Sequence, residues 1–326
     1  MLGSLRPLRG HRTADLIRWG ESKARLRATI EMDEVPHKVG LTLESRQRTL
    51  EMDGDRVQDV TAYFNGFRAV AFVPQDGAIL TGEPNIRRRW LDRAAFNITP
   101  SHLVLVRDYR RVVLHKQAVL KEDKPDMDLL DVLDSTLAAK GAELVERRHQ
   151  ALQKLLPEAQ RLHQEICASQ ESLRMELKTA AVGSTLQERQ QALQERLQAS
   201  REGELRRGTT LVGPQLDDVR IWVDEQSARH YASRGQIRSV VLSLKVAGLR
   251  AAGREGHSPV FLVDDLSSEL DQDRTARLLG CLRELGTQVF VTTTDPGSLL
   301  AATDAGEVSW IRVEQGEMHL EDPGKR

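Results

Sequence analysis

The feature that most constrains the fold of this chain is a short apolar segment that ends in two acids. Residues 259–263 have the sequence PVFLV, and Asp264 and Asp265 follow at once. A run without polar side chains predicts a strand buried on both faces. A second run, QVFV at 288–291, comes after an amphipathic helical pattern over 271–285. Strands that alternate with helices predict a parallel α/β sheet, in which ligands bind outside the carboxyl ends of the strands.

The two carboxylates at the end of the buried strand fit a Walker B pattern. In nucleotide-hydrolysing α/β proteins this position lies beside a phosphate-bound Mg²⁺, so Asp264 is expected to hold the metal through water. Asp265 stands where a general base orients or deprotonates the attacking water. The alternative is an Asp pair that caps the following helix, and the pair alone does not decide between the two interpretations.

A second motif lies shortly before the strand. Residues 232–236, ASRGQ, open a predicted buried helix over 237–249. Ser233 and the Gly235 backbone N–H can point at a phosphate from the helix N-terminus, where the helix dipole favours anions. An N-cap followed by a tight turn would give the same letters. The combination with the Walker B strand favours the phosphate interpretation.

The front of the chain predicts short antiparallel strands from residue 24 to about 73, with an Asp53-Gly54 turn in RTLEMDGDRV. From residue 99 to about 205 the pattern becomes helical, with leucines in three-and-four steps. Pro157 interrupts that pattern and is expected to begin a new helix. Residues 171–179 are expected to form a strand.

Composition excludes several classes of protein. Two cysteines, Cys167 and Cys281, lie far apart, so a disulfide framework is excluded and a reducing cytoplasm is expected. No apolar run approaches the roughly 20 residues that span a bilayer, so no membrane partner is expected. Residues 1–124 hold 22 Lys and Arg against 16 Asp and Glu, a net charge of +6, whereas the remainder holds 25 against 32, a net charge of −7. The overall charge of −1 therefore hides a basic front and an acidic back.

The basic residues of the front half form a candidate DNA surface. They are Arg87, Arg88, Arg89, Arg107, Arg110, Arg111 and Lys116. The spacing of the middle three places them on one helix face, where they could face phosphates. A solvated helix face, or salt bridges to the acidic back half, is the alternative that composition alone favours. Aromatic residues make up only 4% of the chain, which argues against base stacking as the main binding mode.

The order of the motifs resembles an ABC-type ATPase head, with a signature loop ASRGQ, Walker B FLVDD, a D-loop SSELD and a switch strand QVFVTTTD. Four blocks in order, HRTADLIRWGE, FVPQDGAILTGEPNIRRRWLDR, GTTLVGPQLDD and YASRGQIRSVVLSLKVA, resemble the RecF recombination-mediator family. Gln75 and Gln215 depart from the acid and the histidine usual in that family, so the contacts of those two side chains are open. The resemblance extends over nearly the whole chain.

The resemblance implies an α/β fold, an ABC-type P-loop ATPase head. Its expected parts are a partial β-rich lobe over 1–98, an inserted helical subdomain over 99–207 and an α/β lobe over 208–326. It implies a homodimer that binds ATP with Mg²⁺ and single-stranded or gapped DNA. The expected role is recombinational gap repair and the DNA damage (SOS) response, with RecR- and RecO-like partners that help to load recombinase. Nucleotide contacts are expected from Ser233, Gly235, Gln236, Asp264 and Asp271, with Asp264 at the metal and Asp265 as the catalytic base.

One expected motif is missing. P-loop ATPases cradle phosphates with G-x-x-x-x-G-K-[ST], and no such run occurs in the 326 residues. The resemblance places Met1 just downstream of that loop and of the first strands, so the chain is about 40 residues shorter than expected from the family. Either the true start codon lies upstream, or the chain is a remnant that binds DNA or acts as a scaffold without hydrolysing ATP. The chain is expected to bind ATP weakly or not at all, whereas an in-frame extension restores binding.

Overall fold

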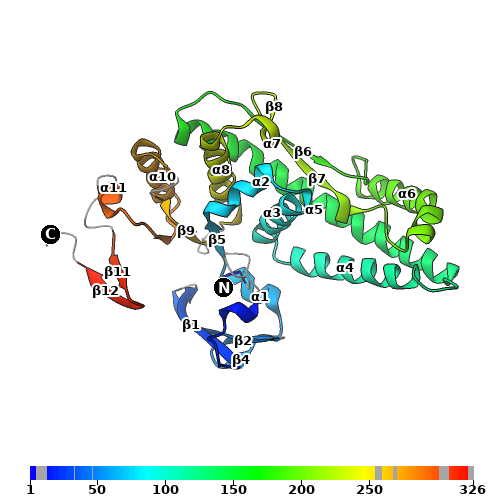
Figure 1. Cartoon of the computed structure of the whole chain (residues 1–326), viewed down its shortest axis with the longest axis horizontal. Helices are drawn as coiled ribbons and strands as arrows, with labels where there is room; N and C mark the ends of the chain where they lie inside the picture. Colours follow the sequence, from blue (N-terminus) through cyan, green and yellow to red (C-terminus); the bar gives the residue numbers. More distant parts are fainter. Residues whose placement is uncertain are drawn as a thin grey trace.

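The computed structural model describes residues 1–4, 13–32, 34–45, 47–253, 259–266, 270–300 and 308–321. A small antiparallel sheet lies at one side, a parallel sheet with its helices in the middle, and helices α4, α5 and α6 extend away from both (Figure 1). The D-loop residues 267–269 lie outside the described residues.

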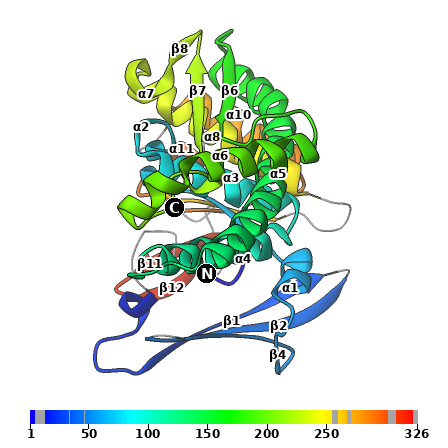
Figure 2. The ribbon, with the colours of Figure 1, turned by 90° about the vertical axis from the view of Figure 1, so that its right-hand side faces the viewer.

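The antiparallel sheet confirms the predicted strands of the front segment. Its strands pair in the order β1, β2, β3, β4 and span Lys23–Met32, Val35–Glu44, Arg48–Met52 and Asp55–Arg56. The predicted turn joins the last two strands, with positive φ at Asp53 and Gly54. One face is apolar and buries Val39, Leu41 and Leu43 against Phe64 of α1 (Val60–Gly66). Figure 2 shows this sheet below the rest of the molecule.

The central parallel sheet contains three strands in the order β10, β9, β5. They span Val289–Val291, Val260–Val263 and Ala69–Phe72, and both pairs are parallel. The two predicted strands are therefore neighbours, but the prediction that both are buried is wrong for β10, whose Phe290 is 50% exposed. Helix α8 (Arg234–Ala252) contributes Val240, Val241 and Leu242 to the same core, each 0% exposed, which confirms the predicted buried helix. The predicted α/β class with a parallel sheet is confirmed.

The helical subdomain consists mainly of α4 (His102–Val119), α5 (Met127–Cys167) and α6 (Leu186–Arg207). The leucine stripe predicted from the sequence is buried along α5. The prediction that Pro157 begins a new helix is wrong, because α5 continues through it. Loss of one backbone hydrogen bond at a mid-helix proline costs about 3 kcal/mol. Leu155, Ala159 and Leu162, all fully buried, hold both sides of the proline in the core and offset that cost.

Buried ion pairs join the helices of the subdomain. Lys116 of α4 is fully buried, and its Nζ lies 2.5 Å from Asp134 Oδ1 of α5 and 2.5 Å from Glu204 Oε2 of α6. Arg201 adds a second cation to Asp134 at 2.6 Å. Since a buried charge is tolerated only with a partner, these contacts fix how the three helices pack.

The remaining elements complete the layers around the core. A second antiparallel sheet pairs β6, β7 and β8, and a separate hairpin pairs β11 with β12. These strands are β6 (Leu173–Lys178), β7 (Asp218–Val223), β8 (Gln226–Ser227), β11 (Trp310–Glu314) and β12 (Glu317–Glu321). The remaining helices are α2 (Ala78–Thr81), α3 (Pro84–Ile98), α7 (Ala228–Tyr231), α10 (Gln272–Glu284) and α11 (Pro296–Leu300). Three 3-10 turns are η1 (Thr13–Leu16), η2 (Pro74–Gly77) and η3 (Pro214–Leu216). Strand β6 confirms the strand predicted over 171–179. No helix of the described ranges is long and apolar enough to cross a membrane.

The three predicted segments share one hydrophobic core. Strand β5, from the first segment, lies in the same sheet as β9 from the last. One hydrophobic core contains Val70, Leu155 and Phe261, one residue from each predicted segment. The candidate site therefore rests on a core to which all three segments contribute.

Candidate nucleotide-binding site

The first cluster of the candidate site lies at the carboxyl edge of the parallel sheet. Asp264 follows β9, and Thr292 follows the neighbouring strand β10. The Thr292 hydroxyl donates to Asp264 Oδ1 at 2.9 Å and accepts from the Asp265 backbone N–H at 2.9 Å. One hydroxyl therefore fixes the orientation of the Asp264 carboxylate and the position of the next residue.

The backbone at Asp265 adopts an unusual conformation, with a φ of 56°. This left-handed region is costly for most residues and less so for Asp, whose short polar side chain is tolerated there. The Leu266 N–H donates to the Thr292 carbonyl at 3.2 Å, so backbone bonds on both sides hold the turn. Strain at a strand end is common at functional sites, where the surrounding structure maintains it.

The third strand end belongs to β5, on the other side of β9. The Asp264 N–H donates to the Phe72 carbonyl at 2.9 Å, and η2 with Gln75 follows two residues after Phe72 in the sequence. Lys245 of α8 donates to the Ala71 carbonyl at 2.9 Å and pairs with Asp76 at 2.8 Å. The segment after β5 is thereby fixed to α8, and the three carboxyl ends form one edge.

The second cluster is the signature turn at the start of α8. Ser233 is the N-cap, its side chain accepts from the Gln236 N–H, and Gln236 Oε1 accepts from the Ser233 N–H, which makes a capping box. These bonds satisfy the Ser233 and Gln236 amides but leave the Arg234 and Gly235 amides without an acceptor among the described residues. Free N–H groups at the positive end of a helix dipole suit an anion.

Asp271 joins this second cluster through an arginine. It caps α10 by accepting from the Arg274 N–H at 2.9 Å, and its other oxygen lies 3.5 Å from Arg274 Nε. Arg274 Nη1 lies 3.6 Å from the position that a Cβ on Gly235 would occupy. The signature turn therefore has a guanidinium beside its glycine, which adds positive charge at the helix terminus.

The residues present fit a nucleotide with Mg²⁺ in two parts. Carboxylate and hydroxyl oxygens at the strand edge are the donors that Mg²⁺ prefers. The described residues contain no group of three or more His, Cys, Asp and Glu placed to hold a metal, so phosphate oxygens and water would supply the remaining ligands. Backbone amides and Arg274 at the signature turn suit phosphate oxygens.

Sequence reasoning missed three contributors to these clusters. Thr292 could have been found, because it follows the second apolar strand as Asp264 follows the first. Arg274 lies one helical turn after the D-loop and carries no motif. Glu171 accepts from Gln236 Nε2 at 2.7 Å across 65 residues of sequence, and no local signal predicts that contact.

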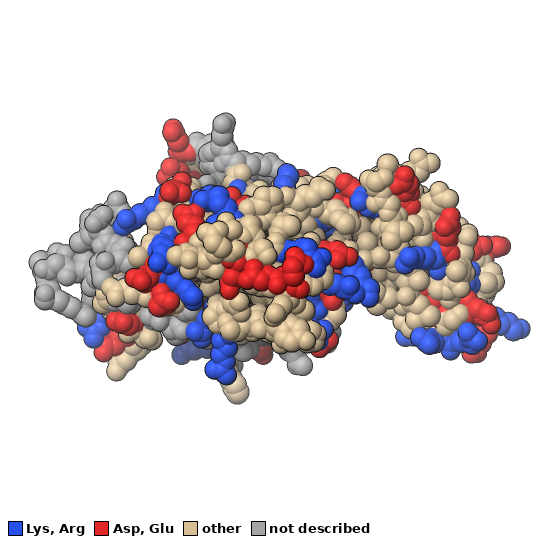
Figure 3. All heavy atoms as spheres, turned by 90° about the horizontal axis from the view of Figure 1, so that it is seen from above, with Lys and Arg blue, Asp and Glu red and all other residues tan. Residues whose placement is uncertain are grey.

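The predicted DNA residues separate into exposed and buried groups. Arg107, Arg110 and Arg111 are exposed along α4, and Arg89 is exposed on α3. Arg88 is partly buried and donates to the Asp217 carbonyl at 2.5 Å. On the face shown in Figure 3, Lys and Arg lie interspersed with Asp and Glu. The exposed arginines of α4 therefore form a local basic stripe, and the surface shown in Figure 3 is not uniformly basic.

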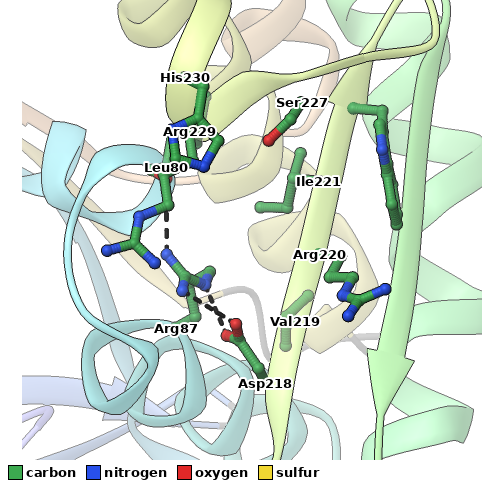
Figure 4. Close-up of a pocket in the computed structure, with 10 residues that line it drawn as sticks. Leu80, Arg87, Asp218, Val219, Arg220, Ile221, Ser227, Arg229 and His230 are labelled. Carbon is green, nitrogen blue, oxygen red and sulfur yellow. Dashed lines mark hydrogen bonds and ion pairs between the residues drawn. The ribbon is translucent and has the colours of Figure 1, made fainter.

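Arg87 and Lys116 are corrected from DNA contacts to internal ion pairs. Lys116 is fully buried between two carboxylates, and Arg87 is 3% exposed. Arg87 Nε and Nη2 donate to the two Asp218 oxygens at 2.7 and 3.1 Å, beside a pocket of about 310 Å³ between α3 and β7 (Figure 4). Both cations already have carboxylate partners, so a DNA phosphate cannot replace solvent around them.

Comparisons with known proteins give consistent relatives. The chain is 35% identical to the DNA replication and repair protein RecF of Myxococcus xanthus (strain DK1622), over 97% of this chain and 85% of the relative. It is 36% identical to the protein of the same name from Geobacter metallireducens, over 95% of this chain and 85% of that one. A solved structure of the recombination mediator protein RecF with ATP, in the RecFOR pathway, matches with a TM-score of 0.86 at 26% identity, covering 98% of this chain and 87% of that chain. No model of a protein family matches.

Proposed function

Because the chain belongs to the RecF family of DNA replication and repair proteins, we propose that it acts in recombinational repair of gapped DNA during replication. The fold is that of an ABC-type ATPase head, as the match to the ATP-bound RecF structure indicates. The non-hydrolysing scaffold is the less favoured alternative, since both clusters of a nucleotide site are built from described residues.

ATP with Mg²⁺ is the proposed ligand of the two clusters. The observation that carries this proposal is the Thr292 hydroxyl, which orients Asp264 and holds the strained turn at Asp265. Asp264 would hold Mg²⁺ through water, and Asp265 would orient the attacking water. Asp264 and Asp265 then act on nucleotide at the sheet edge of their own chain.

The signature turn is proposed to act on the nucleotide of a second copy of the chain. Ser233 and Gln236 close the capping box, so that the free amides at the start of α8 are those of Arg234 and Gly235, and Asp271 holds Arg274 beside them. A phosphate held between two copies would join them, because each copy supplies only part of the donor set. ATP is thus proposed to stabilise a homodimer.

DNA is the proposed partner of this dimer, contacted mainly through its backbone. The exposed residues available for this role are Arg89, Arg107, Arg110 and Arg111, with Arg88 at the edge. Such contacts release counterions and weaken as salt rises. By family, we propose cytoplasmic RecR- and RecO-like partners, a part in the SOS response and a role in loading recombinase.

The test is DNA binding measured with and without ATP and Mg²⁺. ATP should be titrated into the millimolar range, because the 326 residues contain no P-loop lysine. We expect ATP with Mg²⁺ to tighten binding to gapped DNA, and Asp264→Asn to abolish that increment while leaving binding without nucleotide unchanged. Sedimentation in the same buffers should show ATP-dependent dimers of the wild type only.

Thr292→Val serves as the matched variant, since it keeps the shape of the side chain and removes the hydroxyl that orients Asp264. It should reduce the ATP-dependent increment less than Asp264→Asn does. An increment of full size in Asp264→Asn would refute the assignment of the metal-site carboxylate. If DNA affinity is the same with and without ATP in the wild type and in every variant, the non-hydrolysing alternative is favoured.

A further inference from the structure

A histidine and a cysteine lie near the carboxyl end of α5, and a glutamate follows shortly after the helix and contacts the signature turn. Cys167 Sγ lies 3.7 Å from His163 Nδ1, and His163 Nε2 lies 2.9 Å from Glu171 Oε2. The His163 side chain is fully buried, whereas Cys167 is partly exposed. A nucleophile, a base and a group that orients the base therefore stand in hydrogen-bonding contact.

A second donor faces the same sulfur. Ser239 of α8 is 1% exposed, and its hydroxyl has no conventional hydrogen-bond partner among the described residues. That hydroxyl lies within the reach of Cys167 and lowers the pKa of its thiol. A buried hydroxyl without another acceptor is stabilised by an anionic sulfur or by an oxygen attached to that sulfur.

The electrostatics of the cluster favour a thiolate–imidazolium pair. Burial raises the pKa of Cys167, but the bonds from His163 and Ser239 and the charges of His163 and Arg274 outweigh it and lower that pKa. Burial lowers the pKa of His163, but contacts with Cys167 and Glu171 outweigh it and raise that pKa. Cys167 is the last residue of α5 and His163 lies four residues before it, near the carboxyl end of the helix, where the helix dipole favours the cationic imidazole.

The other cysteine of the chain provides an internal contrast. Cys281 is 1% exposed, and its Sγ donates to Glu165 Oε1 at 3.2 Å. Burial and that carboxylate raise the pKa of Cys281 to about 12. Because the thiolate is the reactive form, the environment of Cys281 makes it inert, whereas that of Cys167 makes it nucleophilic.

We propose that Cys167 is a modification site for small hydroperoxides. The Cys167 thiolate attacks the terminal peroxide oxygen, so an S–O bond forms and the O–O bond breaks. The sulfur is oxidised by two electrons to a sulfenic acid, and the peroxide is reduced to an alcohol or to water. His163 gives its proton to the departing alkoxide or hydroxide and becomes neutral.

The modification has a route to the signature turn. Glu171 binds His163 through Oε2 and Gln236 Nε2 through Oε1, at 2.9 and 2.7 Å. Loss of the imidazolium charge would weaken the first of these contacts and free the Glu171 side chain to move. Oxidation of Cys167 is therefore expected to reduce the ATP-dependent increment in DNA binding. This expectation rests on the proposed function.

The experiment follows sulfenic acid with a dimedone probe and mass spectrometry after hydrogen peroxide is added to the folded, full chain. At pH 7 Cys167 should be labelled at least about tenfold faster than Cys281. As pH rises, the labelling rate of Cys167 should reach its plateau at a pH below the pKa of an ordinary thiol. The proposal is overturned if Cys167 reacts no faster than a cysteine in a short peptide. This readout does not depend on ATP or DNA, so its failure is distinct from failure of the proposed function.

Three variants test the role of the neighbours. Ser239→Ala should slow labelling of Cys167 and move its pH profile upward, and His163→Gln should do so more strongly, by about tenfold at pH 7. Glu171→Gln alters a partly exposed side chain and should disturb the fold less than His163→Gln does. It therefore still tests the role of the neighbours if His163→Gln does not fold. An unchanged pH profile in Ser239→Ala and Glu171→Gln, with the fold confirmed by circular dichroism, would show that the neighbours do not activate the thiol.

Discussion

Substitution of Gly235 by alanine separates the function of the signature turn from its stability. Gly235 lies in the first turn of α8 with an ordinary helical backbone, so no left-handed conformation requires glycine there. A Cβ at this position would have Arg274 Nη1 at 3.6 Å and Ser233 Oγ at 4.0 Å as its nearest neighbours, both ordinary van der Waals distances. The added methyl group therefore fits the free protein.

The expected change in stability follows from that geometry. Alanine is favoured over glycine within a helix by roughly 0.5–1 kcal/mol, and less at the first turn. Gly235→Ala should therefore unfold at the same urea concentration as the wild type or slightly above it. The methyl group would instead occupy the space through which a phosphate approaches the Gly235 amide, so the ATP-dependent increment in DNA binding should be lost.

A matched glycine variant controls for nonspecific effects. Gly213 has a φ of 129°, and a Cβ there would lie 2.4 Å from the Tyr109 hydroxyl. Gly213→Ala should destabilise the protein by more than about 2 kcal/mol, because strain and overpacking add. Retention of the full ATP-dependent increment in Gly235→Ala would refute the phosphate role of the turn. A loss of stability above about 1 kcal/mol in that variant would refute the packing argument.

Three further sets of substitutions probe the charged groups. Lys116→Met leaves two buried carboxylates without their shared cation and should lower the free energy of unfolding by about 3–5 kcal/mol in urea melts, with partial recovery when Glu204→Gln is added. Burial raises the pKa of Asp217 to about 6 although Arg148 lowers it, so the folded state binds more protons than the unfolded state between about pH 4 and 6. Stability should fall as pH rises through that window, by up to about 3 kcal/mol, and Asp217→Asn should flatten this part of the profile in melts at several pH values. Replacement of Arg107, Arg110 and Arg111 by Gln should change the free energy of unfolding by no more than about 0.5 kcal/mol. The same replacement should reduce the slope of log DNA affinity against log salt concentration by up to about 3. Arg206→Gln on α6 is the control and should change that slope by less than about 1.

Local patterns predicted the elements whose cause is itself local. The Asp53-Gly54 turn follows from the conformational tolerance of those two residues, and positive φ occurs at both. The strands before Asp264 and Thr292 follow from apolar runs too short for helices, but β10 is only partly buried, because Phe290 at its centre is 50% exposed. Pro157 failed as a helix start because packing of α5 against the core outweighs the lost hydrogen bond, and sequence spacing carries no measure of that packing.

Charged residues were harder to place because their partners are remote in sequence. Three-and-four spacing correctly put Arg107, Arg110 and Arg111 on an exposed face, whereas Lys116, on the same helix, points to a carboxylate 88 residues away. Arg87 binds a carboxylate 131 residues away. A run of arginines has the same letters whether it faces solvent or a buried aspartate, so spacing alone could not separate a DNA contact from an internal ion pair.

The blocks that carried the family resemblance contain two different kinds of residue. The signature block holds free amides and an exposed Ser233 at a helix start, which is a surface ready for a ligand. The block at 208–218 also carries the resemblance, yet Asp217 and Asp218 at its end are anchored by Arg148 and Arg87. Ligand contact and internal anchoring impose equally strict demands on residue type, so resemblance marks both alike. Exposure distinguishes the signature turn, and its place at the carboxyl edge of the parallel sheet distinguishes Asp264, so both remain candidates for ATP. The 208–218 block is assigned to the architecture that holds α3, α5 and β7 together.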